Sequence, residues 1–225
     1  HDALPISNAA IAHELRTPLT ILRGRLQGLK DNYFTPSEAE FSILISQTET
    51  LARIVEDLRT LSLSINQKLI LNYTMEDLSA IISEVLDFIT PDFEALGIKI
   101  DYEIQSLNTY IDKDRIKQAL LAAIQNVKIH AAEGRYIKVR LFQNKKFAQI
   151  EIIDNGNGLP EDKLVLAKER FWRNDDSRSR NFGGTGLGLS VINAIIVSHK
   201  GKLNIANNKP HGLKIEMVIP IKSNL

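Results

Sequence analysis

The sequence has no cysteine, no long hydrophobic run and almost no excess of either charge. Without cysteine it has no disulfides or cysteine-ligated metal sites, which is compatible with a reducing compartment. No apolar run reaches the roughly 18 residues of a membrane-spanning helix, and residues 1–7 lack the basic start and apolar core of a signal peptide. The 28 Lys and Arg residues balance 27 Asp and Glu residues. This balance argues against a dedicated nucleic-acid binder, and we expect no direct nucleic-acid partner.

The sequence is otherwise ordinary for a globular protein, with 225 residues, of which 44% are hydrophobic and 24% charged. That length suits one or two domains. Its patterning changes near residue 66, from helical periods to alternating strands and helices. We therefore predict a helical hairpin in residues 1–66 and a second domain in residues 67–225.

Two amphipathic helices are expected in the first domain, over residues 8–31 and from Ser37 to about residue 64. Ser37 and Glu40 form a capping-box pattern, and Pro18 predicts a bend in the first helix. One hairpin has too little core to stand alone, so we expect a homodimer with a four-helix bundle; the alternative is that the apolar faces pack on the second domain. These faces consist of Ile11, Leu15, Leu19, Leu22, Leu26 and Leu29 in the first helix, and Phe41, Leu44, Thr48, Leu51, Val55, Leu58 and Leu61 or Ser62 in the second.

The second domain reads as an α/β two-layer sandwich, because its strands follow one another mainly as hairpins with helices between them. Asp77 is the expected cap of its first helix. The expected strands cover residues 69–73, 98–104, 109–112, 136–143, 147–153, 202–205 and 213–220, and the expected helices cover residues 77–90, 114–132 and 186–199.

One histidine stands out in the first helix. His13 lies beside the apolar face and is expected to meet water, where an imidazole titrates near neutrality and can attack phosphorus. Glu14 follows directly and can accept the ring proton, and Thr17 lies one turn further on. For a lone histidine, an ordinary surface position would be the better interpretation.

The whole string from His13 to Thr20, His-Glu-Leu-Arg-Thr-Pro-Leu-Thr, resembles the phosphoacceptor box of two-component sensor histidine kinases. The resemblance implies that His13 receives a phosphoryl group from ATP, with Glu14 as base. It also implies that Thr17 orients water when the kinase dephosphorylates its response regulator.

Four further boxes resemble the ATPase superfamily of gyrase, Hsp90, histidine kinases and MutL (GHKL), which implies its Bergerat fold. The first box is Gln125-Asn126-Val127-Lys128-Ile129-His130. The resemblance implies that Asn126 ligates Mg²⁺ and that Lys128 and His130 lie at the nucleotide. The chain departs from the family at Ala122, where another Asn is frequent, and at Ile129, where Lys or Arg is usual. Lys128 is displaced by one residue, about 100° around a helix.

The second box, Asp154-Asn155-Gly156-Asn157-Gly158, follows an expected strand. Asp-Asn-Gly alone also forms turns, but after a strand the pattern is more specific. By resemblance Asp154 accepts a hydrogen bond from the adenine amine, and Gly156 and Gly158 let the backbone approach the base.

The third box contains Phe171, and the fourth runs through Gly183-Gly184-Thr185-Gly186-Leu187-Gly188 into a helix. Bare N–H groups at a helix start form an anion site, so Gly184, Thr185, Gly186, Leu187 and Gly188 are expected at the triphosphate. The connection of about 25 residues between the second and fourth boxes is long enough for a mobile lid. Its basic residues can stabilise the γ-phosphate or simply be solvated: Lys163, Lys168, Arg170, Arg173, Arg178 and Arg180.

The resemblance implies the cytoplasmic core of a sensor histidine kinase that uses ATP and Mg²⁺ and passes phosphoryl to a response regulator receiver domain. The full-length protein is expected to be anchored in the cell membrane through segments absent here. Within the family the chain looks most like AdeS-type kinases, which control multidrug efflux pumps. Alternatives are a degenerate kinase acting mainly as phosphatase or scaffold, a chaperone- or repair-type ATPase, and a non-enzymatic dimerisation module.

Overall fold

The computed structural model describes residues 8–130, 134–169, 172 and 186–222. The chain forms two compact units, and the break between them falls between Ile65 and Asn66. Within the described ranges, every helix is too short or too polar to cross a membrane.

The first unit is a hairpin of two long helices, α1 (Asn8–Lys30) and α2 (Glu38–Ile65). Ser37 caps α2 as predicted, because its Oγ accepts a hydrogen bond from the Glu40 N–H at 3.2 Å. The Glu40 carboxylate instead pairs with Arg25 of α1, with Nη1 2.8 Å from Oε1. The Arg25 guanidinium also lies 5.0 Å from the centre of the Phe34 ring in the turn. The second half of the capping box is thus replaced by a link between the helices.

Each helix of the hairpin carries two rows of residues at heptad spacing, and only one of them is covered. In α1 the row Leu15, Leu22 and Leu29 is half-buried, whereas Leu19 and Leu26 are 58% and 54% exposed. The same division occurs in α2. Leu44, Leu51 and Leu58 form its half-buried row, and Phe41, Thr48, Val55 and Ser62 form its exposed row.

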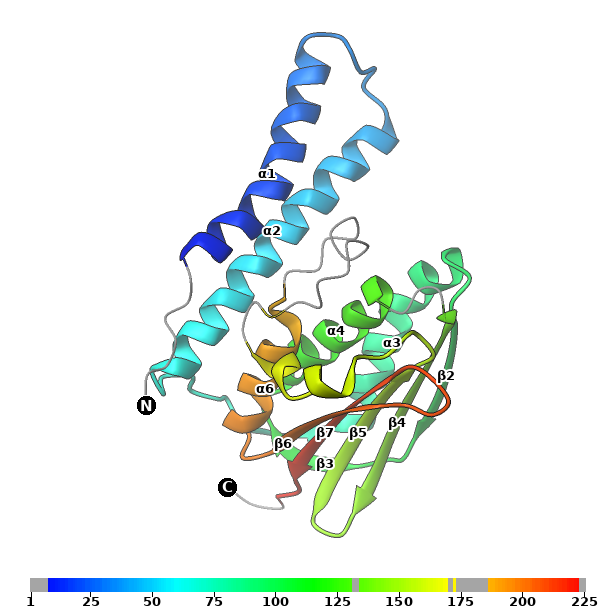
Figure 1. The fold of residues 1–225 in the computed structure, drawn as a ribbon. Coiled ribbons are helices and arrows are strands. Elements are labelled where there is room, and N and C mark those ends of the chain that lie inside the picture. Colours follow the sequence, from blue (N-terminus) through cyan, green and yellow to red (C-terminus); the bar gives the residue numbers. More distant parts are fainter. Residues whose placement is uncertain (1–7, 131–133, 170–171, 173–185, 223–225) are drawn as a thin grey trace. The chain divides into compact units, whose positions relative to one another are not determined.

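The second unit is a two-layer α/β sandwich, as predicted (Figure 1). Its five-stranded sheet has the order β2-β4-β5-β7-β6, in which only the β2–β4 pair is parallel. Three helices, α3, α4 and α6, cover one face of this sheet, and β1 and β3 form a separate two-stranded sheet. The bounds are β1 Thr74–Asp77, α3 Leu78–Ala95, β2 Lys99–Ile104, β3 Asn108–Ile111, α4 Lys113–His130, β4 Tyr136–Asn144, β5 Phe147–Asp154, the 3-10 turns Glu161–Lys163 and Leu166–Lys168, α6 Gly188–Ser198, β6 Lys202–Asn207 and β7 Leu213–Pro220.

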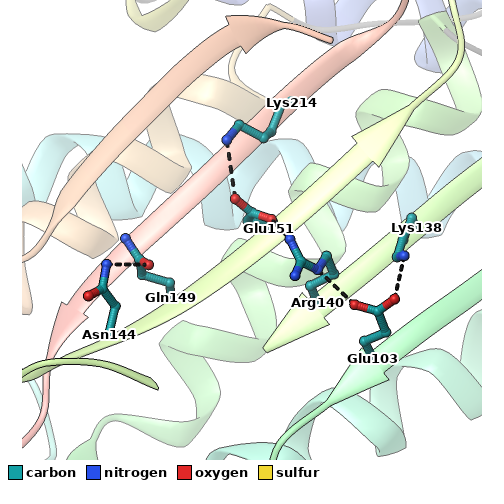
Figure 2. A network of polar contacts seen from close by, with 7 residues as sticks. All are labelled: Glu103, Lys138, Arg140, Asn144, Gln149, Glu151 and Lys214. Atoms are coloured by element: carbon teal, nitrogen blue, oxygen red, sulfur yellow. Dashed lines mark hydrogen bonds and ion pairs between the residues drawn. The ribbon is translucent and has the colours of Figure 1, made fainter. Parts of the chain in front are cut away.

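Alternation along the strands divides the sheet into an apolar and a polar face. The helix-covered face carries the buried residues Ile137, Val139 and Leu141 of β4 and Ile150 and Ile152 of β5. The other face carries a chain of ion pairs across four strands (Figure 2). In it Glu151 pairs with both Arg140 and Lys214, and Glu103 pairs with both Lys138 and Arg140.

Two expected elements differ from the structure. Residues 69–73 are not a strand, and β1 lies directly after them. The Asn72 N–H is taken by the Asp112 carboxylate at 2.8 Å instead of by a neighbouring strand. The helix expected to end at residue 90 continues through Pro91 to Ala95. Phe93, which is buried in that last turn, provides packing that outweighs the hydrogen bond lost at proline.

Candidate active site

The expected phosphoacceptor lies on α1, in the first unit. His13 and Thr17 are exposed, Glu14 is half-buried and Pro18 is buried. The prediction that the His13 side chain meets water is therefore confirmed. Because residues three and four apart share a helix face, His13 and Thr17 lie on one accessible patch.

The Asp154 carboxylate is held at the end of β5 in the second unit. Its Oδ1 accepts hydrogen bonds from the Gly156 N–H at 2.8 Å and from the Leu213 N–H at 3.1 Å. Asp154 is only 4% exposed. Burial raises the pKa of this carboxyl above its ordinary range, and the two N–H donors oppose that shift. The side chain thus has a fixed orientation before any ligand arrives.

Close backbone contacts surround the Asp154–Asn155 peptide. A Cβ atom on Gly134 would lie 2.4 Å from the Asn155 carbonyl oxygen, and one on Gly212 would lie 1.8 Å from the Asp154 carbonyl oxygen. Only glycine fits at either position without movement of the backbone. Gly134 and the turn before β7 therefore both meet the end of β5.

Helix α4 lies against the start of α6. The Ala122 carbonyl oxygen would lie 3.7 Å from a Cβ atom on Gly188, the first residue of α6. Asn126 lies one turn after Ala122 and is half-buried. Within the described residues no side chain caps α6, so its first N–H groups are suited to an anion.

Two lysines make contacts within the protein: Lys128, expected at the nucleotide, and Lys168, for which both a phosphate role and a solvated position were open. The Lys128 ammonium lies 2.7 Å from the Asp92 carboxylate of α3. The Lys168 ammonium donates to the Leu203 carbonyl oxygen of β6 at 2.6 Å. Burial and the nearby charge of Lys202 lower the pKa of Lys168. Both ammonium groups are thus held by protein oxygen atoms.

Several expected site residues lie outside the described residues: Phe171, Arg178, Arg180, Gly184 and Thr185, together with Arg170 and Arg173, and the side chain of His130. Gly186 and Leu187 are described, and Leu187 is fully buried at the start of α6. Gly186, two residues before α6, has a left-handed φ of 65°.

Family models match both units. Residues 7–66 match the His Kinase A (phospho-acceptor) domain, and residues 111–223 match the histidine kinase-, DNA gyrase B-, and HSP90-like ATPase. The chain belongs to the sensor histidine kinase family.

Relatives of this histidine kinase include known sensor proteins. The signal transduction histidine-protein kinase BaeS of Escherichia coli K12 is 30% identical over 220 residues, covering 96% of this chain and 47% of BaeS. The sensor protein kinase WalK of Staphylococcus aureus is 28% identical, covering 94% of this chain and 52% of WalK. The chain thus spans about half the length of the curated relatives that it matches.

Solved structures support the same membership. The Acinetobacter baumannii histidine kinase AdeS superposes with a TM-score of 0.74 at 36% identity, covering 94% of this chain and 98% of that one. Histidine kinase ThkA shares the fold at 24% identity, with a TM-score of 0.68 over 95% of this chain and 60% of its own.

Several residues that shape the site of this histidine kinase, two through their side chains and one through its backbone N–H, could not be identified from the sequence. Asn207 binds the backbone of Leu159, Leu213 donates to Asp154, and Asp92 holds Lys128. The Asn-Asn-Lys-Pro-His-Gly turn at residues 207–212 was a visible signal of a tight turn. Its contact with the Asp154 loop was not visible, because that contact joins residues far apart in the sequence.

Proposed function

We propose that this chain is the ATP-binding and phosphoacceptor core of a sensor histidine kinase, in which His13 is phosphorylated from ATP. One observation carries the proposal: an exposed histidine in a phosphoacceptor helix and a unit of the ATPase family occur in the same chain. Asp154, already oriented by two N–H donors, accepts from the adenine amine. The start of α6 receives the phosphates.

In the proposed transfer His13 is the nucleophile. One ring nitrogen attacks the γ-phosphorus, the bond from that phosphorus to the β–γ bridging oxygen breaks, and ADP leaves with the electron pair. Glu14 takes the proton from the other ring nitrogen. The phosphoryl group then moves from the nitrogen to a carboxylate oxygen of an Asp on a response regulator receiver domain. The ThkA structure contains a response regulator, TrrA, which supports that kind of partner for the fold.

Asn126 is the residue proposed to hold Mg²⁺. Its amide oxygen is a hard donor of the kind that Mg²⁺ prefers, and the residue is half-buried on α4. The described residues contain no group of three or more His, Cys, Asp or Glu side chains that could hold a metal ion. When bound, Mg²⁺ neutralises charge on the phosphates.

The dimer belongs to the same proposal. The exposed rows Leu19 and Leu26 in α1, and Phe41 and Val55 in α2, match the surface that a second hairpin would cover.

The exposed Thr17, one turn from His13, supports a second role in dephosphorylation of the regulator. Cytoplasmic placement of this core and membrane anchorage of the full-length protein remain predictions.

The test is phosphoryl incorporation from γ-labelled ATP and Mg²⁺ into the parent chain, His13→Ala and Asn126→Ala. We expect acid-labile, base-stable label in the parent and loss of at least about 100-fold in both variants. Asn144→Ala is the matched control, because Asn144 lies at the end of β4 and its Nδ2 donates to Gln149 Oε1 at 3.1 Å, away from the boxes of the site. Label retained in His13→Ala would contradict the assigned acceptor.

A degenerate kinase acting as phosphatase or scaffold is the second candidate. It is favoured by Ala122, by Ile129 and by the ion pair that holds Lys128 to Asp92. Nucleotide binding by the parent without any label on His13 would support this second candidate over the first.

A further inference from the structure

The side chain of Asn207, the last residue of β6, is bound to the backbone of the Asp154 loop. Its Oδ1 accepts from the Leu159 N–H at 2.9 Å, and its Nδ2 donates to the Leu159 carbonyl oxygen at 2.7 Å. The same Nδ2 lies 3.5 Å from Glu161 Oε1. One amide thus satisfies both backbone groups of a single residue, and its orientation is set by having a donor and an acceptor opposite it.

The strand partner of Asn207 holds the other end of the same loop. Asn207 and Leu213 are the last pair of the β6–β7 ladder. The Leu213 N–H donates to Asp154 Oδ1 at 3.1 Å, and the Asn208 N–H closes the turn on the Gly212 carbonyl oxygen at 2.9 Å. A single ladder pair therefore contacts the segment 154–159 at both its first and its last residue.

Gly158 makes the approach of Asn207 possible. Its φ is +66°, and a Cβ atom there would lie 2.6 Å from Asn207 Oδ1. The family resemblance explains a glycine at position 158 by the close approach of the backbone to the base. The structure gives a second explanation for this glycine, because a side chain here would displace the Asn207 amide and break its hydrogen bonds to Leu159.

We infer that Asn207 is a positioning residue that keeps segment 154–159 in its nucleotide-binding shape; the inference rests on the ATP site proposed above. Residues 155–160 belong to no helix or strand, so side-chain hydrogen bonds must supply the order that a ladder would supply elsewhere. Without Asn207 the Leu159 end of the loop would lose both of its side-chain hydrogen bonds, and nucleotide binding would bear the entropy cost of ordering that end.

The inference is tested by Asn207→Ala in the full chain, with Asn204→Ala as the matched control. Asn204 lies on the same strand, and its Nδ2 donates to Glu216 Oε2 at 2.6 Å, so it loses a comparable bond away from the loop. Calorimetric titration with MgADP and the rate of label incorporation at varied ATP give Kd, KM and kcat. Thermal unfolding and circular dichroism check that each variant is folded.

In Asn207→Ala we expect the Kd for MgADP and the KM for ATP to rise about tenfold, with kcat at saturating ATP within about twofold of the parent. Asn204→Ala should leave all three unchanged. A residue needed only for folding would lower the active fraction, and hence kcat, without moving Kd or KM. That pattern, or an unchanged Kd in folded Asn207→Ala, would overturn the inference.

Asn207→Asp decides the matter if the alanine variant does not fold. It keeps the side-chain size and the acceptor for the Leu159 N–H but loses the donor to the Leu159 carbonyl oxygen, and we expect its KM to rise at least about threefold. Faster hydrogen exchange at the Leu159 N–H in the alanine or aspartate variant would support the same conclusion.

A parent chain that binds no MgADP would overturn the proposed site together with this inference. A parent that binds MgADP, with variants that bind it equally well, would overturn the inference alone.

Discussion

The hairpin and the sandwich differ in how much apolar surface each buries by itself. In the sandwich, the inward-facing residues of the central strands, such as Ile150 and Ile215, are covered by helices of the same chain. In the hairpin, Leu19, Leu26 and Val55 lie in regular rows that the hairpin does not cover. The comparison teaches that a sheet with three helices on one face completes its own core, whereas two helices leave half of each apolar face to a partner.

The largest expected effect is on the dimer. We expect the parent to be a dimer and Leu19→Glu/Leu26→Glu to raise the dimer Kd at least about 1,000-fold, or about 4 kcal/mol, because each dimer would bury four carboxylates in apolar rows. Sedimentation velocity over a range of protein concentrations measures this change.

The control for the dimer experiment is Val165→Glu, a comparable change at an exposed position of the sandwich. It should leave the dimer Kd as it is. A parent that stays monomeric, or a doubly substituted chain that dimerises as well as the parent, would break the comparison.

A smaller effect is expected from a cavity in the sandwich. Ile150→Ala removes a fully buried side chain from β5, and should lower the free energy of unfolding of the second unit by about 3 kcal/mol. Urea denaturation followed by circular dichroism provides the measurement. Ile70→Ala, at a position 90% exposed in the same unit, should change stability by less than about 0.5 kcal/mol. Equal losses in the two variants would show that the second unit does not have the core described here.

The smallest effect concerns pH and the buried His199 in the sandwich. Its Nδ1–H donates to the Ile195 carbonyl oxygen at 2.8 Å, and its Nε2 accepts from the Asp112 N–H at 3.1 Å, which fixes a neutral ring. Burial lowers the pKa of His199; the Ile195 carbonyl and the Asp112 charge oppose that shift, and the Lys222 charge adds to it. Tyr73 packs edge-on against the ring, with centroids 5.5 Å apart.

Because the folded pKa of His199 lies below the unfolded one, the unfolded chain binds more protons as the medium becomes acidic. The stability contributed by the neutral ring is complete above about pH 6.5, the unfolded pKa, and is lost as pH falls below it. Urea midpoints of the second unit between pH 7.5 and pH 5 should therefore fall more steeply in the parent than in His199→Gln. Parallel slopes would contradict this prediction.

Much of the fold could be predicted because its signals are local. Helix starts follow from Ser37 and Asp77, whose side chains bond to N–H groups two or three residues on. The strands β4, β5 and β7 follow from period-two alternation. The strand expected at residues 69–73 was wrong, because a short apolar run does not say whether its N–H groups meet another strand or, as for Asn72, a carboxylate.

The candidate site likewise consists of local motifs, which the sequence predicts, and of long-range contacts, which it does not. The boxes around His13, Asn126 and Asp154 are continuous strings, so their residues could be named without a fold. The groups that hold those strings come from elsewhere in the chain. Asn207 lies 48 residues after Leu159, and Lys128 lies 36 residues after Asp92.

The sequence by itself determined most of the helices and strands and that His13 stands beside an apolar helix face. Those features depend on side-chain period and on hydrogen bonds within a few residues. Only the tertiary structure decided that the Glu40 carboxylate pairs with Arg25 and not with its own helix start. The same holds for the hydrogen bonds of Asn207 and Leu213 to the Asp154 loop. These contacts depend on the strand order β5-β7-β6 and on the pairing of α1 with α2. Both arrangements result from many weak packing interactions between residues far apart in the sequence, so no short stretch of the sequence predicts them.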